Sequence, residues 1–229
     1  MCGRFTIGEI KDLVTRFSID QPIADMPRPR YNLAPTQDAP IVVRASPNRL
    51  VMMRWGLIPF WAKDAKIGSK MINARAEGLS DKPAFRVSLK ERRCLVPTTG
   101  FYEWKRTDGG KAPYLARVID DKLFAMAGLY DRWKDPSGSE VLSFTIITTA
   151  ANELMAKVHD RMPVILSKED EDRWLTPGPI GEAERERMFA PYPPERMEAF
   201  PVSRQVNDIS NDSPALVRPI AGEKAGTWF

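Results

Sequence analysis

The second residue of the chain is a cysteine, Cys2, which directly follows the initiator Met1. Methionine aminopeptidases remove the initiator before small residues, so we expect the mature chain to begin at Cys2. Its α-amine would titrate near ~7.7–8.0 and its thiol near ~8.5, so a useful fraction of each is nucleophilic at neutral pH. The amine can form an imine with an aldehyde, and the thiol can then close a thiazolidine, which an internal cysteine cannot do because its nitrogen is an amide. The alternative is that Cys2 is merely a small second residue.

A histidine and a carboxylate are the candidate acid-base groups. His159 is the single histidine of the chain, and its unperturbed pKa of about 6.5 suits proton transfer at neutral pH. A structural histidine is the alternative. Glu103 and Phe101 are two residues apart, so a strand would place both on one face. A carboxylate on an apolar face has a raised pKa and can act as a general acid or base, whereas an exposed edge-strand Glu is the alternative.

Asn73 and Arg75 would share one face of an extended segment for the same reason. An amide can hold a sugar or carbonyl oxygen, and a guanidinium can bind a phosphate through two hydrogen bonds. The alternative is a surface turn in which Arg75 forms an ordinary ion pair with Glu77.

Basic and aromatic residues are interleaved along the chain. Cations follow a phosphate backbone and aromatic rings stack on unpaired bases, so this pattern favours single-stranded nucleic acid, although solvated faces are also basic. A net charge of +4 and a pI near 9.1 allow an anionic partner without identifying one. The positions are Arg4, Arg54, Trp55, Phe60, Trp61, Arg75, Arg92, Arg93, Trp104, Lys105, Arg106 and Arg161.

Several function classes are excluded. Two distant cysteines and one histidine supply neither a disulfide framework nor the usual ligand count of a zinc site. The chain has no glycine-rich phosphate loop, no G-x-S-x-G elbow and no paired-carboxylate nuclease cluster, so we expect no metal and no nucleotide cofactor. It also has no apolar run of about 20 residues and no signal-peptide region, so we expect a cytoplasmic protein without membrane contact.

The pattern of short apolar runs predicts an α+β fold with a dominant sheet in a single domain. The composition is that of a globular protein, and 20 prolines favour short elements joined by irregular loops. Strands are predicted at 40–45, 49–55, 93–97, 113–119, 123–130 and 141–149, with a last strand at 197–206. Helices are predicted at 7–18, 82–92, 151–157 and 167–175, the first from a capping box formed by Thr6 and Glu9.

Two segments are predicted to be irregular. Residues 21–40 contain five prolines without a clear period and should form an ordered loop. Residues 176–195 are the best candidate for a mobile excursion, and the final residues of the polar tail should be loose.

Six short motifs stand out along the chain. They are Met1-Cys2-Gly3-Arg4-Phe5, Arg30-Tyr31-Asn32-Leu33-Ala34-Pro35, Trp55-Gly56-Leu57-Ile58-Pro59, Ile72-Asn73-Ala74-Arg75-Ala76-Glu77, Gly100-Phe101-Tyr102-Glu103-Trp104 and His159-Asp160-Arg161-Met162-Pro163-Val164. In order and spacing, these motifs resemble those of the SOS response-associated peptidase (SRAP) family. A further match to the family's last motif lies at Pro201-Val202-Ser203 with Val206-Asn207.

The resemblance implies a monomeric domain over residues 2–220, a β-barrel-like and mainly antiparallel sheet with flanking helices, followed by a tail at 221–229. It implies that the protein binds single-stranded DNA, associates with the nucleoid when DNA-bound, and crosslinks covalently to the aldehyde of abasic sites. Family members are also credited with releasing themselves by a peptidase-like or reversal (lyase) chemistry.

Residue roles follow from the matching motif positions. Cys2 would be the nucleophile, Asn73 would orient the sugar and the Cys2 backbone, Glu103 would move protons at the amine, and His159 would assist ring opening. The implied DNA contacts are phosphates at Arg4, Arg75 and Arg161, and bases at Pro35 and Trp61.

The chain departs from the family pattern at a few positions. Thr98-Thr99 stands where a small and an acidic residue are expected, Gly78 where Thr is usual, and Phe60 where a small or polar residue is commoner. None of these changes removes a reacting group, so they affect loop geometry and DNA contacts instead of the chemistry.

Two rival functions remain open at this stage. Cys2, His159 and Asn73 have the residue types of a thiol peptidase. A non-covalent module for single-stranded DNA, with an incidental cysteine, is the other.

Overall fold

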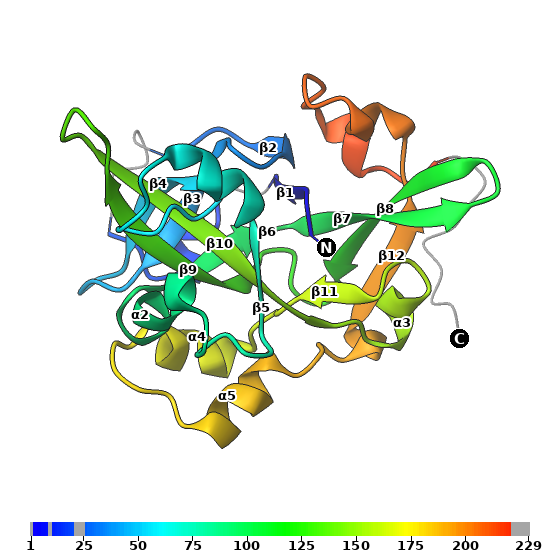
Figure 1. Ribbon diagram of the computed structural model, residues 1–229. Coiled ribbons are helices and arrows are strands. Elements are labelled where there is room, and N and C mark those ends of the chain that lie inside the picture. Colours follow the sequence, from blue (N-terminus) through cyan, green and yellow to red (C-terminus); the bar gives the residue numbers. More distant parts are fainter. Residues whose placement is uncertain (1, 9–10, 21–25, 221–229) are drawn as a thin grey trace.

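A closed β-barrel forms the centre of the computed structural model, which describes residues 2–8, 11–20 and 26–220 (Figure 1). Neighbouring strands pair antiparallel from β4 through β3, β6 and β9 to β10, and the parallel pairing of β10 with β4 closes the ring. The barrel strands are β3 (Asp38–Val43), β4 (Arg49–Trp55), β6 (Arg93–Thr98), β9 (Phe124–Lys134) and β10 (Glu140–Ala150).

Strand β10 continues beyond the barrel and carries two short strands on its sides. On the side of β4 it pairs in parallel with β5 (Asn73–Arg75), and on the side of β9 it pairs antiparallel with β11 (Arg161–Pro163). In the register, Thr148 of β10 lies between Arg75 of β5 and Pro163 of β11. Segments that are far apart in the sequence therefore meet at the end of β10.

A second sheet of five antiparallel strands packs beside the barrel. Its order is β12 (Met197–Pro201), β8 (Gly110–Val118), β7 (Gly100–Thr107), β1 (Phe5–Ile7) and β2 (Arg30–Leu33). Phe5 contacts Trp55 edge to face with ring centroids 5.1 Å apart, and Trp55 stacks on Phe144 of β10. This aromatic row joins β1, and hence the N-terminal segment, to the barrel core.

Helices cover the barrel on the side of β6 and β9 (Figure 1). Arg93 of β6 is buried and donates hydrogen bonds to the carbonyl oxygens of Leu89, Trp174 and Gly178, which ties the ends of two helices to the strand. The helices are α1 (Leu13–Arg16), α2 (Pro83–Glu91), α3 (Glu153–Ala156), α4 (Lys168–Leu175) and α5 (Glu182–Phe189), with short 3-10 turns at Ala65–Lys70, Pro194–Arg196, Arg204–Asn207 and Pro214–Val217.

A close backbone approach fixes the turn that follows β4. Gly56 has φ of +121°, and a Cβ atom there would lie 2.6 Å from the carbonyl oxygen of Gly68. Only glycine accommodates both this dihedral angle and this contact. The 3-10 turn Ala65–Lys70 is therefore packed directly against the barrel.

The sequence prediction of an α+β fold with a mainly antiparallel barrel and flanking helices is confirmed. The six strands predicted between residues 40 and 149 are present, with ends that differ by a few residues. The helices predicted at 82–92, 151–157 and 167–175 are also present within a few residues. Ser167 caps α4 as expected, because its side chain accepts from the backbone N–H of Asp170. Two of the departures from the family pattern have a structural reason. The Thr98 hydroxyl is buried and forms hydrogen bonds with the carbonyl oxygens of Thr6 and Gly100, and Gly78 has φ of +68°, which favours glycine.

The predicted helix at 7–18 is wrong. Residues 5–7 form strand β1, and among the described residues of this range only Leu13–Arg16 are helical. The Thr6 hydroxyl donates to the carbonyl oxygen of Arg30 across the sheet, whereas Glu9 and Ile10 lie outside the described residues. The apolar spacing of Leu13, Val14 and Phe17 therefore belongs to a helix of four residues and its C-terminal cap.

Three other segments differ from their predictions. The region 176–195 contains helix α5, whose Met188 and Phe189 are buried in the core. The strand predicted at 197–206 ends at Pro201 and is followed by a 3-10 turn. The region 21–40, predicted as a loop, contains β2 and the start of β3, while residues 21–25 and the tail at 221–229 lie outside the described part of the chain.

Candidate active site

The N-terminal segment places Cys2 at the junction of the barrel and the second sheet. Cys2 is fully buried, and Asn73 of β5 donates a hydrogen bond of 2.7 Å from its side-chain amide to the Cys2 carbonyl oxygen. The other amide atom, Asn73 Oδ1, is buried without a hydrogen-bond partner among the described residues. Asn73 thus fixes the backbone of Cys2 and has an acceptor left for a further donor.

The thiol of Cys2 is held in its neutral form. Burial raises its pKa far above the usual range, and the negative charge of Glu103 raises it further. The Sγ atom points toward the carbonyl oxygen of Arg4 at 3.9 Å. A thiol in this setting does not act as a free thiolate at neutral pH.

Glu103 lies on β7, on the strand face that looks toward Cys2. Phe101, two residues earlier, packs in the same core cluster as Cys2, whereas Tyr102 between them packs in a separate cluster on the other face. Burial raises the pKa of Glu103, and the nearby His159 acts in the opposite direction. The expected alternation is therefore confirmed, and Glu103 is a buried carboxyl group with electrostatic links to both Cys2 and His159.

His159 lies in the turn between α3 and β11, with its side chain partly exposed. Its Nδ1 atom is 3.0 Å from the backbone N–H of Arg161, which donates to it, and 2.8 Å from a carboxylate oxygen of Asp160. The N–H satisfies a bare Nδ1, and the carboxylate satisfies a protonated one. The Nδ1 atom of His159 therefore has a partner whether or not it carries a proton.

The three arginines singled out in the sequence have different surroundings. The side chain of Arg75 is exposed and makes no hydrogen bond or ion pair within the described part of the chain. Arg161 forms a two-pronged ion pair with Glu77, at 2.7 and 2.8 Å, so Glu77 pairs with Arg161 and not with Arg75. Arg4 donates through Nη1 to Asn32 Oδ1 and to a backbone carbonyl, and burial lowers its pKa.

Asn32 organises the segment around Arg4, a role that the sequence did not predict. Its side-chain amide nitrogen donates to the carbonyl oxygens of Val206, Asp208 and Asn211. The conspicuous motif around Asn32 therefore fastens the C-terminal part of the described chain to β2. A structural Asn of this kind has no spacing signal, because its partners lie more than 170 residues away.

The two residues expected to touch bases lie in different surroundings. Trp61 is 49% exposed and lines an open hollow of about 490 Å³ together with Lys63, Lys66 and Lys70. Pro35 is half-buried at the turn between β2 and β3. The lysines were missed in the sequence, although their spacing of three and four residues after an aromatic pair was a usable signal.

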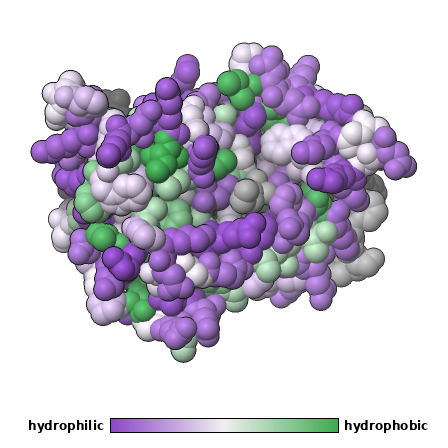
Figure 2. Space-filling view, viewed as in Figure 1, coloured by the Kyte–Doolittle hydropathy of each residue, from purple (hydrophilic) through white to green (hydrophobic). Residues whose placement is uncertain are grey.

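Exposed aromatic rings alone do not define a binding face. Hydrophobic residues are scattered among hydrophilic ones on the face of the molecule in Figure 2. Phe60 is 54% exposed beside Trp61, with its backbone N–H bound to Asp131. Scattered exposed hydrophobics are ordinary on protein surfaces, so only the combination of Trp61 with cations distinguishes this region.

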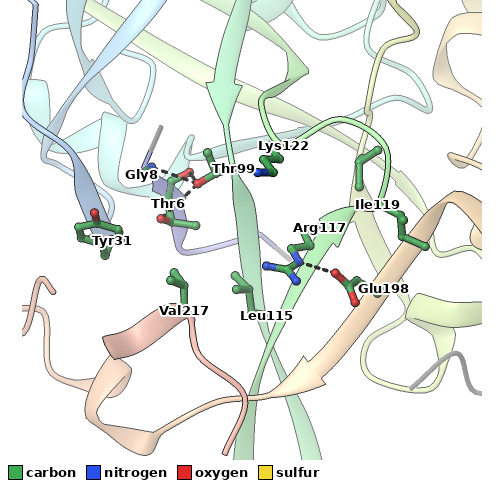
Figure 3. A pocket seen from close by; sticks show the side chains of 11 residues that line it. Thr6, Gly8, Tyr31, Thr99, Leu115, Arg117, Ile119, Lys122, Glu198 and Val217 are labelled. Carbon is green, nitrogen blue, oxygen red and sulfur yellow. Dashed lines mark hydrogen bonds and ion pairs between the residues drawn. The ribbon is translucent and has the colours of Figure 1, made fainter. Parts of the chain in front are cut away.

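A separate cavity of about 340 Å³ lies over the other face of the second sheet (Figure 3). Its lining includes Leu115 and Arg117 of β8, and Arg117 pairs with Glu198. Leu115 packs in the same cluster as Tyr102, which faces away from Cys2. The cavity therefore does not belong to the group around Cys2.

Within residues 2–8, 11–20 and 26–220, no group of three or more His, Cys, Asp or Glu side chains lies close enough together to hold a metal ion. No helix in this part of the chain is long and apolar enough to cross a membrane.

Comparison with known proteins gives matches over nearly the whole chain. The family model described as "SOS response associated peptidase (SRAP)" matches residues 1–209. The chain is 48% identical over 221 residues to abasic site processing protein YoqW of Bacillus subtilis (strain 168), covering 95% of this chain and 99% of that protein. It is 34% identical over 226 residues to abasic site processing protein HMCES of Gallus gallus, covering 84% of this chain and 67% of that protein.

Solved structures show the same fold. A crystal structure of a protein from Bacteroides thetaiotaomicron superposes with a TM-score of 0.85 at 31% identity, over 95% of this chain and 99% of that one.

Proposed function

The chain belongs to the SOS response associated peptidase (SRAP) family, and from this premise we propose that it processes abasic sites in DNA by a covalent crosslink to Cys2. Its relatives in Bacillus subtilis and Gallus gallus are named abasic site processing proteins. The observation that carries the proposal is the attachment of the Cys2 backbone to Asn73 beside the buried carboxyl group of Glu103. A reacting N-terminus needs such a fixed position next to a proton-transfer group.

The proposed reaction begins after removal of Met1. The Cys2 amine attacks the C1′ aldehyde of the ring-opened sugar, and the resulting carbinolamine loses water to give an imine. The sulfur then adds to the imine carbon while its proton goes to the nitrogen, which closes the thiazolidine. The sum is aldehyde plus aminothiol giving thiazolidine plus one water, without any oxidant or cofactor.

The environment of Cys2 supports attack by the amine before the thiol. Burial and Glu103 both disfavour the thiolate, whereas the thiol retains the proton that the imine nitrogen needs in the last step. A carboxyl group with a raised pKa, Glu103, can take a proton from the amine and return it to the departing hydroxyl. Reversal of the crosslink would use the same steps in the opposite order.

The partly exposed His159 is suited to the sugar and not to the thiol. It can transfer a proton to or from the sugar hydroxyl during ring opening, since both of its protonation states have a partner. The charge of His159 lowers the pKa of Glu103, so protonation of His159 favours the carboxylate form of Glu103.

Single-stranded DNA is the proposed form of the substrate. Arg75 offers an exposed cation for a phosphate, and Trp61 offers a ring surrounded by lysines on which an unpaired base can stack. A base pair in a duplex would present no face to Trp61.

A thiol peptidase is less well supported by this site. Such an enzyme needs an activated thiolate, yet both the burial of Cys2 and the charge of Glu103 raise the thiol pKa.

The proposal is tested by incubating the mature protein with abasic and intact single-stranded oligonucleotides and separating the products on a denaturing gel. A heat-stable adduct should form with the abasic strand alone. Adding residues before Cys2, or replacing it in Cys2→Ala, should abolish the adduct, whereas Cys94→Ala should not, because Cys94 is buried in the barrel. Equal adduct yield from a chain with a blocked amine would refute the thiazolidine. Binding without any adduct would support the non-covalent module.

A further inference from the structure

The ion pair between Glu77 and Arg161 occupies the position at which Arg161 would hold a phosphate. The guanidinium donates from Nη1 to one carboxylate oxygen at 2.7 Å and from Nη2 to the other at 2.8 Å. Phosphate oxygens accept from arginine in the same two-pronged geometry. Glu77 therefore presents to Arg161 the kind of oxygen pair that a DNA backbone also presents.

Arg161 has a second anchor that does not depend on Glu77. Its Nη2 atom also donates to the carbonyl oxygen of Thr148 on β10 at 2.6 Å, and its side chain is only 14% exposed. If Glu77 turned away, this hydrogen bond would keep the guanidinium in place, and its two N–H donors would be free for bidentate binding of another anion.

Glu77, in contrast, is the exposed partner of the pair. Its side chain is 60% exposed, and it lies in the turn after β5. Exposed carboxylates form weak ion pairs that solvent and competing anions readily replace. The exchange of Glu77 for another anion therefore requires only a side-chain movement at the surface.

The location of the pair places it beside the unpaired cation Arg75. Arg75 faces Thr148 in the register of β5 with β10, and Arg161 faces Ala150 in the register of β11 with β10. The two arginines thus flank the same end of β10 from opposite sides. The positive charges of Arg161 and Arg75 both lower the pKa of Glu77, so this carboxylate is ionised at neutral pH.

We propose that Glu77 is a specificity residue that occupies Arg161 until a DNA phosphate displaces it. With Glu77 in place, Arg75 is left as the free cation of this arginine pair, so an intact strand is held weakly. This inference rests on the proposed function, in which Arg161 contacts the strand. Its consequence is selectivity: the protein avoids undamaged strands, and the covalent step retains damaged ones.

The test measures binding of the mature protein to an intact single-stranded oligonucleotide over a range of salt concentrations. Glu77→Gln should bind about two- to fivefold more tightly, the range expected for an ion pair of this exposure. Its salt dependence should be steeper by up to about 0.7 in the logarithmic slope, because in the wild type the displaced Glu77 carboxylate attracts a cation and so offsets part of the counterion release that accompanies binding of the phosphate to Arg161. A purely structural role for Glu77 would give weaker or unchanged binding, and either result overturns the proposal.

Two control variants separate release of Arg161 from a general change of charge. Glu186 lines the same surface hollow as Glu77 and forms no ion pair within the described residues, so Glu186→Gln should change affinity and slope much less. In an Arg161→Ala background, Glu77→Gln should no longer raise affinity. An equal gain from Glu186→Gln, or a gain that survives Arg161→Ala, would contradict the exchange.

A crystal structure of the wild-type protein with the same oligonucleotide tests the exchange even if Glu77→Gln does not fold. A phosphate should lie against the guanidinium of Arg161, with Glu77 turned away. A Glu77–Arg161 pair that persists with DNA bound overturns the inference. Adduct formation by the wild-type protein is measured separately on an abasic strand, so failure of the proposed function is distinguished from failure of the exchange.

Discussion

Replacing Asn73 by alanine tests whether the position of the N-terminus limits the reaction. Asn73→Ala removes the 2.7 Å hydrogen bond to the carbonyl oxygen of Cys2, a residue with no exposed surface. A buried acceptor that loses its donor costs about 1–3 kcal/mol. If that energy holds Cys2 in its reacting position, the rate of adduct formation should fall by about 5- to 150-fold, since about 1.4 kcal/mol corresponds to a factor of ten.

The assay is a single-turnover time course with the protein in excess over an abasic oligonucleotide, quenched in denaturant and resolved on a gel. Thermal unfolding is followed in parallel. The melting temperature of Asn73→Ala should also fall, because a buried acceptor loses its donor, so its rate is compared with that of a control variant that loses a similar amount of stability.

Asn152 provides the matched control. It is also buried, but it caps α3 by accepting from the backbone N–H of Met155 and donates to the carbonyl oxygen of Tyr192. Asn152→Ala should lower the melting temperature, as loss of a helix cap costs about 1 kcal/mol, and leave the rate unchanged. A wild-type rate in Asn73→Ala would refute the positioning argument.

Three other predictions concern a carboxyl group, a turn and a cation. Burial raises the pKa of Glu103, so its contribution to stability is present below the unfolded pKa of about 4.3 and is lost as the pH rises through the folded value. Glu103→Gln should therefore melt at a higher temperature than wild type at pH 8 and at the same temperature near pH 4. Its rate of adduct formation should fall by about 10²-fold or more. A lower melting temperature than wild type at pH 8 would contradict the stability prediction. Gly56→Ala should lower the free energy of unfolding in urea by about 3 kcal/mol, because its Cβ atom adds both backbone strain and a clash. Gly138→Ala should lower it by about 1–2 kcal/mol, because Gly138 also has a positive φ but open space for a Cβ atom. Equal losses in the two variants would show that the clash contributes nothing. Arg75→Ala should weaken binding to every single-stranded sequence and flatten the logarithmic salt slope by about 0.7. Arg132→Ala, on the β9–β10 hairpin, should have a smaller effect on both. A loss of affinity confined to one sequence would exclude a phosphate contact at Arg75.

The barrel strands could be predicted from the sequence because each is a short apolar run bounded by turn residues. The strand at Arg49–Trp55 even has its predicted ends. Strands β5 and β11 have three residues each, too few for any period to show, and β10 alone brings them together. Helix α5 was missed because five of its eight residues are charged and its contribution to the core comes from its last two residues.

The candidate residues of the site could be selected by residue type, but their surroundings could not. Asn73 was expected to orient the Cys2 backbone, and a hydrogen bond joins these two residues. The partner of Arg161 was not foreseeable, since Glu77 lies 84 positions away in the chain. The raised thiol pKa of Cys2 also depends on burial by segments distant in sequence, so it could not be predicted from the sequence around Cys2.

Mass spectrometry of the intact adduct tests the central claim most directly. The account predicts a mass equal to the chain without Met1 plus the abasic oligonucleotide minus one water, with fragmentation locating the DNA at Cys2. An adduct that retains Met1, an adduct located at another residue, or the absence of any covalent product would contradict it.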